Sequence, residues 1–231
     1  MKIALCLSGQ PRSFIKGYEY YKQNLLTKFD VDVFIHTWIY NELEQIKSLY
    51  NPVSLLAEKE LSFDIDQKYT HTPNASKWPP RFTISSFYSI FRCCLLKIDH
   101  EIKTKQYDWV IKTRFDFALP VVIPFDRLQK DALYMPPCRT KAFGDWLGND
   151  QFAIGDSNIM NVYMSTYLNM EKYYNSGHQM IGEEMLRANL IENDLQKKIA
   201  YIDMPAPFPP GPHNGTPHFL IRDDYEQWTK S

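Results

Sequence analysis

The sequence KIALCLSGQPR, residues 2–12, begins with a continuous apolar run and ends in a turn rich in Gly, Gln and Pro. An unbroken apolar run predicts a strand that is covered on both faces, as in a parallel sheet with helices on either side. Residues 14–28 then repeat apolar side chains with a period of 3.6 residues, which predicts a helix. Strand, turn and helix in this order indicate the start of an α/β fold.

The rest of the chain continues the alternation of strands and helices. Further strands are expected at 31–36, 53–57, 109–113, 133–135, 151–154 and 199–203. Further helices are expected at 41–50, 83–105, 158–174 and 182–192, with long loops at 59–82 and 136–149. We therefore expect a single α/β domain over residues 1–231, with a central, mostly parallel sheet flanked by helices and a proline-rich tail at 205–231.

The charge balance and the N-terminal run exclude several classes of protein. The 231 residues carry 26 Lys and Arg against 27 Asp and Glu, so the net charge of -1 disfavours nucleic acid as a partner. The apolar run Ile3 to Leu7 is too short for a signal peptide or a membrane span. The four cysteines have no Cys-x-x-Cys spacing and are interpreted as reduced thiols. We expect a cytoplasmic protein without membrane insertion.

The turn after the first strand is the first candidate binding site. In open α/β sheets ligands collect at the carboxyl ends of the strands, which is where Ser8, Gly9, Gln10 and Arg12 stand. Glycine lets the backbone approach a ligand, and the Arg12 guanidinium can clamp a phosphate at the helix N-terminus. The turn is neither a P-loop nor a Rossmann Gly-x-Gly-x-x-Gly. The alternative is an ordinary tight turn with a surface arginine.

A second group of charges gathers where the 109–113 strand ends. The period of two places Lys112, Arg114 and Asp116 on one side of the extended chain. A carboxylate at this position can hold a divalent ion bound to a diphosphate, and the two cations can neutralise the same phosphates. The alternative is a salt-bridged strand edge.

Five segments together resemble a known family. They are KIALCLSGQPRSF (2–14), FDVDVFIHTW (29–38), YDWVIKTRFDF (107–117), NDQFAIGD (149–156) and GEEML (182–186). In this order and spacing they resemble the small GT-A-type nucleotide-sugar glycosyltransferases of bacterial surface-polysaccharide loci and large DNA viruses. The resemblance implies a GT-A-like, Rossmann-related domain with a nucleotide-sugar-binding half at 1–118 and an acceptor-binding half at 119–204.

The resemblance also implies where the donor and a metal bind. Ser8, Gly9, Gln10 and Arg12 would lie near the nucleotide diphosphate, and His36 and Thr37 would lie near the nucleoside. A polar stripe on the long helix, from Ser85 to Arg92, would face the donor sugar, with Arg92 as its cation; a solvated helix face is the alternative. The segment Arg114-Phe115-Asp116 stands in the place of the Asp-x-Asp metal motif, with its first acid replaced by Arg114.

Mn²⁺ or Mg²⁺ is accordingly the expected cofactor. Asp116 is the expected metal ligand, and His213 in the tail is a candidate for completing the site. A solvated loop histidine is the alternative for His213.

The acceptor side is expected around three carboxylates. Asp150 follows a Gly-Asn turn and precedes a short strand, while Glu183 and Glu184 open a helix, where acids are also favoured by the helix dipole. If the enzyme inverts the anomeric centre, one of these three is the general base that deprotonates the acceptor hydroxyl.

The expected function is transfer of a sugar from a nucleoside-diphosphate sugar, with UDP favoured, to a glycan acceptor. Two alternatives remain open at this point. The segment Pro11-Arg12-Ser13 resembles the phosphosulfate loop of sulfotransferases, although Phe14-Ile15-Lys16 then departs from that pattern. A carbohydrate- or nucleotide-sugar-binding module without catalysis is the other alternative.

Overall fold

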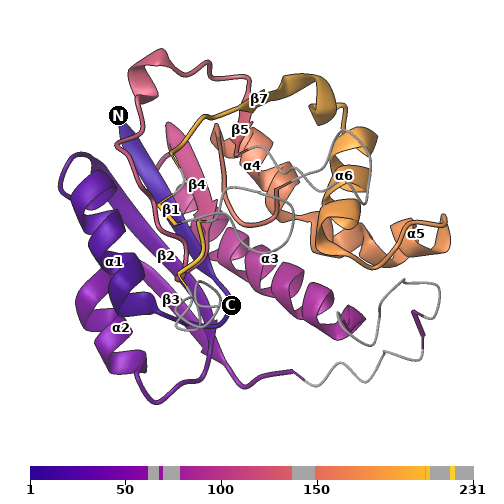
Figure 1. Cartoon of the computed structure of the whole chain (residues 1–231), viewed down its shortest axis with the longest axis horizontal. Coiled ribbons are helices and arrows are strands. Elements are labelled where there is room, and N and C mark those ends of the chain that lie inside the picture. Colours follow the sequence, from indigo (N-terminus) through magenta and orange to yellow (C-terminus); the bar gives the residue numbers. More distant parts are fainter. Residues whose placement is uncertain (62–67, 70–78, 137–148, 206, 209–218, 222–231) are drawn as a thin grey trace.

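The computed structural model describes residues 1–61, 68–69, 79–136, 149–205, 207–208 and 219–221. Seven strands form one sheet in the order β3-β2-β1-β4-β6-β5-β7 (Figure 1). Their bounds are β1 Lys2–Ser8, β2 Asp30–Trp38, β3 Ser54–Glu58, β4 Trp109–Thr113, β5 Leu133–Met135, β6 Ala153–Gly155 and β7 Ile199–Tyr201. The pairs β1·β2, β1·β4, β2·β3 and β5·β7 are parallel, whereas β6 runs antiparallel to β4 and β5. The expected α/β fold with a mostly parallel sheet is confirmed.

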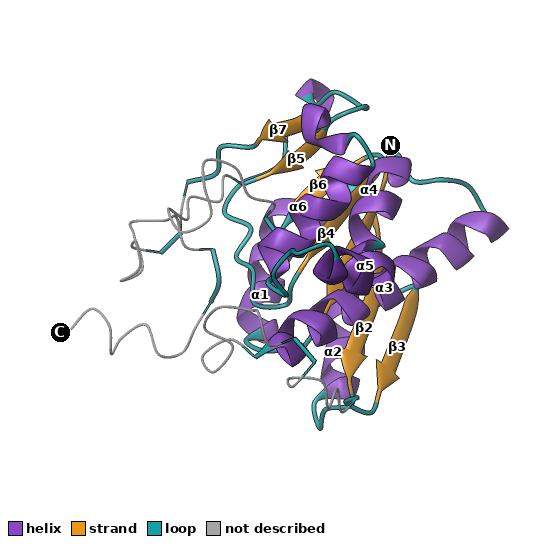
Figure 2. Ribbon diagram, turned by 90° about the vertical axis from the view of Figure 1, so that its right-hand side faces the viewer, coloured by secondary structure: helices purple, strands orange, loops and turns teal. Residues whose placement is uncertain are grey.

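Helices cover both faces of the sheet (Figure 2). The α-helices are α1 Phe14–Tyr21, α2 Leu43–Tyr50, α3 Pro80–Lys103, α4 Ser157–Met164, α5 Met170–Asn175 and α6 Gly182–Glu192. The shorter turns are the π-helix η1 Lys22–Leu26 and the 3₁₀ turns η2 Phe125–Arg127, η4 Thr166–Asn169 and η5 Leu195–Lys198. One hydrophobic cluster joins α1 and α2 to the sheet, and a second joins α3, α4, α5 and α6 to the opposite face.

The central strand β1 explains why its sequence is continuously apolar. Ile3, Leu5 and Leu7 belong to the cluster under α1 and α2, whereas Ala4 and Cys6 belong to the cluster under α3. All five side chains are fully buried, so each face of the strand needs apolar residues.

Several predicted bounds differ from the structure where local hydrogen bonds compete with regular geometry. The helix expected at 14–28 is α-helical only to Tyr21 and continues as η1, a wider turn that buries both Asn24 and Leu25. The helix expected at 158–174 is split into α4, η4 and α5. The strand expected at 151–154 is β6, Ala153–Gly155, because the Asn149 side chain accepts from the backbone N–H groups of Gln151 and Phe152 and makes a turn there.

Strand register brings the candidate residues to one edge of the sheet. Ser8 pairs with His36, Leu7 with Thr113, and Lys112 with Ala153. Because β6 is antiparallel, the segment that precedes it lies beside the carboxyl end of β4. The turns after β1, β2 and β4 and the turn before β6 therefore meet at this edge.

Candidate functional site

The turn after β1 is fixed by hydrogen bonds on its inner side and has free space on its outer side. Gly9 has φ +99°, a conformation that favours glycine. Its N–H donates to Ser89 Oγ at 2.7 Å and to the His36 carbonyl at 3.2 Å, and its carbonyl accepts from Thr37 Oγ1 at 3.0 Å. A Cβ built on Gly9 would meet nothing within 4 Å, so its outer side faces open space. A ligand can approach the backbone here.

Arg12 is the exposed cation of this turn. Its guanidinium donates to the Gln10 side-chain carbonyl, which keeps both side chains within the turn. Ser13, at the start of α1, donates to the backbone carbonyl of Ile221 at 3.4 Å. The expected phosphate-binding residues are thus together at the carboxyl end of β1, with Arg12 available to solvent.

Three residues expected to line the donor lie behind the turn instead. His36 and Thr37 have no exposed surface. Arg92 is half-buried, and its Nε lies 3.3 Å from Glu58. These side chains support the first-strand turn from within, so a direct contact between His36 or Thr37 and a donor requires the turn to move.

The turn after β4 is built around a bidentate ion pair. Arg114 Nε and Nη2 donate to the two carboxylate oxygens of Asp116, each at 2.8 Å. Asp116 is buried, whereas 34% of the Arg114 side chain is exposed. Tyr21 OH donates to the Arg114 carbonyl at 2.7 Å, and Asn24 Nδ2 donates to the Leu119 carbonyl at 2.7 Å. The first helix and its π-turn therefore fix this turn and present the Arg114 guanidinium at the surface.

A short tail segment closes the other side of the same turn. Ala118 N–H donates to the Phe219 carbonyl and Ile221 N–H donates to the Asp116 carbonyl, both at 2.7 Å. Leu220 forms an antiparallel bridge with Phe117, and the Phe219 ring stacks on Phe117. Residues 219–221 are buried, so the tail is part of the wall around Asp116.

Lys112 joins β4 to the turn before β6. Its side chain is buried, and its ammonium donates to the backbone carbonyl of Asp150. Burial lowers the pKa of Lys112 to about 8, although the Asp150 and Asp116 carboxylates oppose the change. Tyr163 OH donates to the neighbouring Asn149 carbonyl at 2.5 Å. Lys112 thus positions Asp150 from inside the protein and is not exposed to a ligand.

The Asp150 carboxylate packs against the first turn of α6. A Cβ at Gly182 would lie 2.7 Å from Asp150 Oδ2, so only glycine leaves room for the carboxylate there. Glu183 follows at once, and burial raises its pKa to about 7, with the negative charge of Asp150 acting in the same direction. The structure therefore brings Asp150 and Glu183 together.

Glu184, the third expected acid, is engaged elsewhere. It accepts from His178 Nδ1 at 2.9 Å and lies 3.8 Å from Arg187 Nη1. The hydrogen bond from His178 and the ion pair with Arg187 give Glu184 a partner on each side.

The Asp116 carboxylate is already engaged by a cation of the protein itself. Both of its oxygens accept from Arg114, and a divalent cation would have to share this carboxylate with the guanidinium. Within the described ranges, no three His, Cys, Asp or Glu side chains are grouped closely enough to hold a metal ion. His213 lies outside the described residues.

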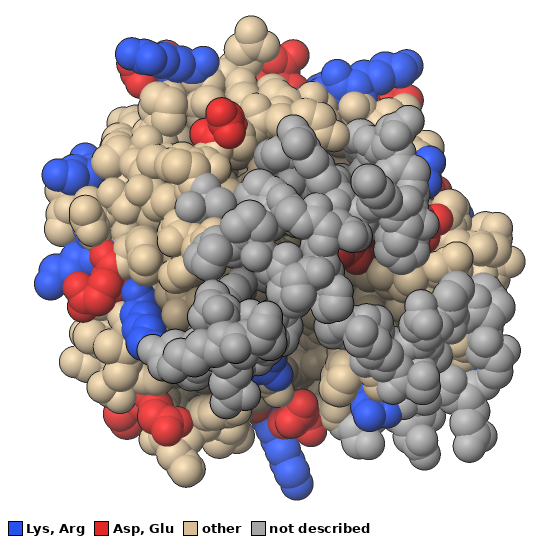
Figure 3. All heavy atoms as spheres, viewed as in Figure 1, with Lys and Arg blue, Asp and Glu red and all other residues tan. Residues whose placement is uncertain are grey.

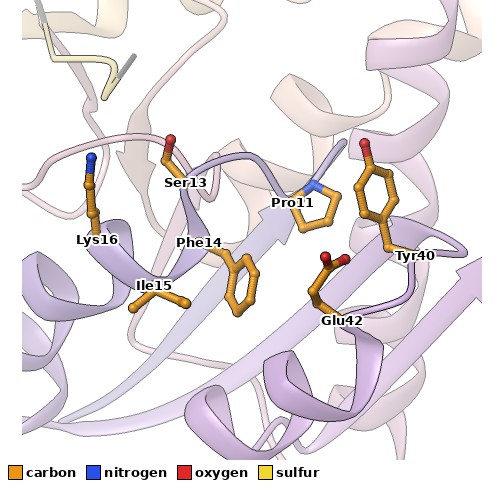
Figure 4. A pocket seen from close by; sticks show the side chains of 7 residues that line it. All are labelled: Pro11, Ser13, Phe14, Ile15, Lys16, Tyr40 and Glu42. Carbon is orange, nitrogen blue, oxygen red and sulfur yellow. The ribbon is translucent and has the colours of Figure 1, made fainter. Parts of the chain in front are cut away.

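A shallow hollow of about 270 Å³ lies beside the first-strand turn (Figure 4). Pro11, Ser13, Phe14, Ile15 and Lys16 contribute one wall, and Tyr40 and Glu42, which follow β2, contribute the other. The hollow extends the edge of the sheet toward α1 and α2.

Two contributors to this edge, Glu58 and residues 219–221, were not predicted from the sequence as site residues, and a third, Ser89, was predicted only within the polar stripe that would face the donor sugar. Ser89 belongs to the polar stripe of the long helix, but its contact with Gly9 follows only from the packing of α3 on β1. Glu58 ends β3 without any motif, and residues 219–221 are separated from Asp116 by about half the chain. Only the Asn149 turn carried a local signal, since Asn before a short strand is typical of a side chain that bonds to nearby backbone.

Charged side chains of both signs are mixed on the visible surface of the protein. On the face in Figure 3, Lys and Arg side chains lie among Asp and Glu without a region of one sign. In the described part of the chain, no helix combines the length and apolar character that crossing a bilayer requires.

A search among curated proteins found no match for this chain. The family described as Domain of unknown function (DUF7796) matches residues 1–209. This range contains all seven described strands and the carboxylates Asp150, Glu183 and Glu184. The chain therefore belongs to the family described as Domain of unknown function (DUF7796).

Proposed function

We propose that this protein is a glycosyltransferase that moves a sugar from a nucleoside-diphosphate sugar, with UDP favoured, to a glycan acceptor. The observation that carries the proposal is that a candidate anion-binding turn and a pair of carboxylates lie at the same edge of the sheet. An open glycine turn with the exposed Arg12 and the partly exposed Arg114 lies at the ends of β1 and β4, and the carboxylates Asp150 and Glu183 lie beside it. Anion binding and proton removal are the two tasks that a glycosyl transfer with inversion of the anomeric centre requires, and we propose that mode of transfer here.

The donor side of the proposal rests on Gly9, Arg12 and Arg114. Gly9 allows the backbone of the turn to approach a diphosphate, and the exposed Arg12 guanidinium lies beside it, held by Gln10. Arg114 keeps part of its guanidinium exposed while Asp116 fixes its orientation. A pre-oriented guanidinium at the place where a diphosphate leaves stabilises the charge that develops on it.

The acceptor side of the proposal rests on Glu183 and Asp150. A carboxylate with a pKa of about 7 is well matched to take a proton near neutral pH. As the acceptor oxygen attacks the anomeric carbon, its proton passes to Glu183 while the bond from that carbon to the diphosphate oxygen breaks. The electron pair of that bond leaves with the diphosphate, toward Arg114. Asp150, held by Lys112, orients the acceptor hydroxyl.

Involvement of Mn²⁺ or Mg²⁺ stays a prediction, and none of these steps depends on it. We further place the reaction in the cytoplasm. The described cysteines, Cys6, Cys93 and Cys94, are free thiols in the core, which fits a reducing compartment.

Ligand-induced thermal stabilisation tests the donor side directly. UDP-, GDP-, CMP- and dTDP-sugars are compared with and without manganese, since stabilisation grows with occupancy. UDP-sugars should raise the melting temperature, and Arg12→Ala should weaken their binding by about 1.5 to 3 kcal/mol, the range for a hydrogen bond to a charged group.

Lys28→Ala is the matched control for the loss of one positive charge. Lys28 is exposed and precedes β2, so it lies at the opposite edge of the sheet. It should leave nucleotide affinity unchanged. Absence of stabilisation by all four nucleotide-sugars, together with absence of transfer to glycan acceptors, would overturn the proposed function.

A further inference from the structure

A serine, a histidine and a glutamate form a continuous hydrogen-bonded row behind the first-strand turn. Ser89 Oγ lies 2.7 Å from His36 Nδ1, and His36 Nε2 lies 2.8 Å from Glu58 Oε2. The three residues come from α3, β2 and β3. Tyr88 OH donates to the same Glu58 oxygen at 3.1 Å, and Arg92 Nη2 donates to its other oxygen at 3.3 Å.

This row has the residue types of a hydrolase triad but lacks an accessible nucleophile. Ser89 and His36 have no exposed surface. The rings of Trp38 and Tyr88 lie edge-on to the imidazole, at 5.3 and 5.8 Å. A substrate carbonyl cannot reach Ser89 Oγ without unpacking α3 from the sheet, so the row must serve another purpose.

The donor and the acceptor of each hydrogen bond in this row can be assigned. Burial lowers the pKa of His36 below its ordinary value, so the ring is neutral at pH 7. Burial acts to raise the pKa of Glu58, but hydrogen bonds from His36 and Tyr88 outweigh it and lower that pKa, so Glu58 is an acceptor. His36 therefore carries its proton on Nε2 and accepts at Nδ1 from the Ser89 hydroxyl.

The end of the row is the Gly9 backbone. Ser89 Oγ gives its proton to His36 Nδ1 and accepts the Gly9 N–H at 2.7 Å. The alternative acceptor for the serine proton, the His36 carbonyl, is farther away at 3.3 Å. Glu58 is thus linked, through two side chains, to the shorter of the two hydrogen bonds of the Gly9 N–H, the other being to the His36 carbonyl at 3.2 Å.

We propose that Glu58, His36 and Ser89 are positioning residues that turn the Gly9 N–H inward and hold the first-strand turn ready for its ligand. For the identity of that ligand, this inference rests on the proposed function. The gain is preorganisation, because a turn fixed in advance does not have to be ordered when the ligand binds. The row contributes to binding without touching the ligand.

Nuclear magnetic resonance of the full chain tests the row without any assumption about function. The ¹⁵N shifts of His36 should report the Nε2–H tautomer in the wild-type protein at pH 7. Glu58→Gln should abolish the exclusive Nε2–H state, because an amide can donate as well as accept. Glu60→Gln, an exposed neighbour beyond β3, is the control and should leave the tautomer unchanged. A charged or Nδ1–H His36 in the wild type would overturn the proposal.

The link to Gly9 is tested by amide exchange and nucleotide affinity. Ser89→Ala and Glu58→Gln should each speed exchange of the Gly9 amide by about fivefold or more, as expected for loss of one hydrogen bond. Both should raise the Kd for UDP and the donor KM by a similar factor while kcat stays unchanged. Unchanged Gly9 exchange in both variants would refute the positioning role.

The two proposals fail in different ways. If wild-type protein binds no nucleotide while the tautomer and Gly9 exchange behave as described, the proposed function is wrong and the positioning of Gly9 stands. If UDP binds but neither variant alters Gly9 exchange or UDP affinity, the positioning role is wrong. A fall in kcat with an unchanged Kd would also contradict it.

Discussion

Replacing Glu183 by glutamine tests the electrostatics of the proposed acceptor site in the folded protein itself. The pKa of Glu183 rises from 4.5 to about 7, first because it is buried and second because of the Asp150 charge. At about 1.4 kcal/mol per pKa unit, ionised Glu183 costs the folded state on the order of 3 kcal/mol. Glutamine has nearly the same shape and cannot ionise.

The sign of the effect follows from linkage. A carboxyl group with a higher pKa in the folded than in the unfolded protein favours folding most below pH 4.5, and this contribution is lost as the pH rises to about 7. The free energy of unfolding of Glu183→Gln and wild type should therefore nearly coincide at pH 4.5. At pH 8 the variant should be more stable by about 3 kcal/mol.

Urea denaturation at pH 4.5, 6 and 8 measures this difference. Glu192→Gln, at the other end of α6, is the control with the opposite sign, since the hydrogen bond from Lys172 lowers the pKa of Glu192. That variant should lose stability above pH 4.5. If the difference in free energy of unfolding between Glu183→Gln and wild type is the same at all three pH values, the pKa of Glu183 is ordinary. Glu183 is then not supported as the general base. Under the proposed function, the rate of sugar transfer should rise with pH to a plateau above about 7 and should lose this dependence in Glu183→Gln.

Three further changes test the neighbouring elements. Gly17→Ala places a Cβ 1.9 Å from the Phe115 carbonyl and should lower the free energy of unfolding by about 1 to 3 kcal/mol or more in urea melts, whereas a gain from better helix propensity would contradict this packing. Leu220→Ala should cost about 2 to 5 kcal/mol by the same measurement because Leu220 is buried against Phe117, while Leu168→Ala, at an exposed position, should cost less than about 0.5. Asp150→Asn should cut the transfer rate by about 100-fold with UDP affinity unchanged, because a misplaced acceptor hydroxyl costs that much, and a fall in UDP affinity instead would place Asp150 on the donor side.

Patterns within single segments determined the fold class. The continuous apolar run Ile3 to Leu7 predicts a doubly covered strand, and the 3.6-residue period after Ser13 predicts the helix that follows. Both signals are local, because burial on two faces or on one stripe leaves its mark on neighbouring residues. The strands at 109–113 and 133–135 and the helix at 182–192 were predicted with the bounds that the structure has.

The π-turn at 22–26 and the breaks after α4 could not be predicted in the same way. Both segments carry hydrogen bonds from distant residues or to them, from Asn24 to the Leu119 carbonyl and from Asn189 to the Val162 carbonyl. A hydrophobic period does not report such bonds.

For the candidate site, the sequence by itself determined which residues stand at strand ends, and hence that Ser8 to Arg12 and Lys112 to Asp116 share one edge of a parallel sheet. Only the tertiary structure decided how those side chains are engaged. It pairs Arg114 with Asp116, buries Lys112 under Asp150 and directs Glu184 to His178. It also brings Glu58 and Ser89 behind Gly9 from other elements. The physical reason is that strand position follows from local periodicity, whereas the partner of a charged group depends on which distant elements pack against it.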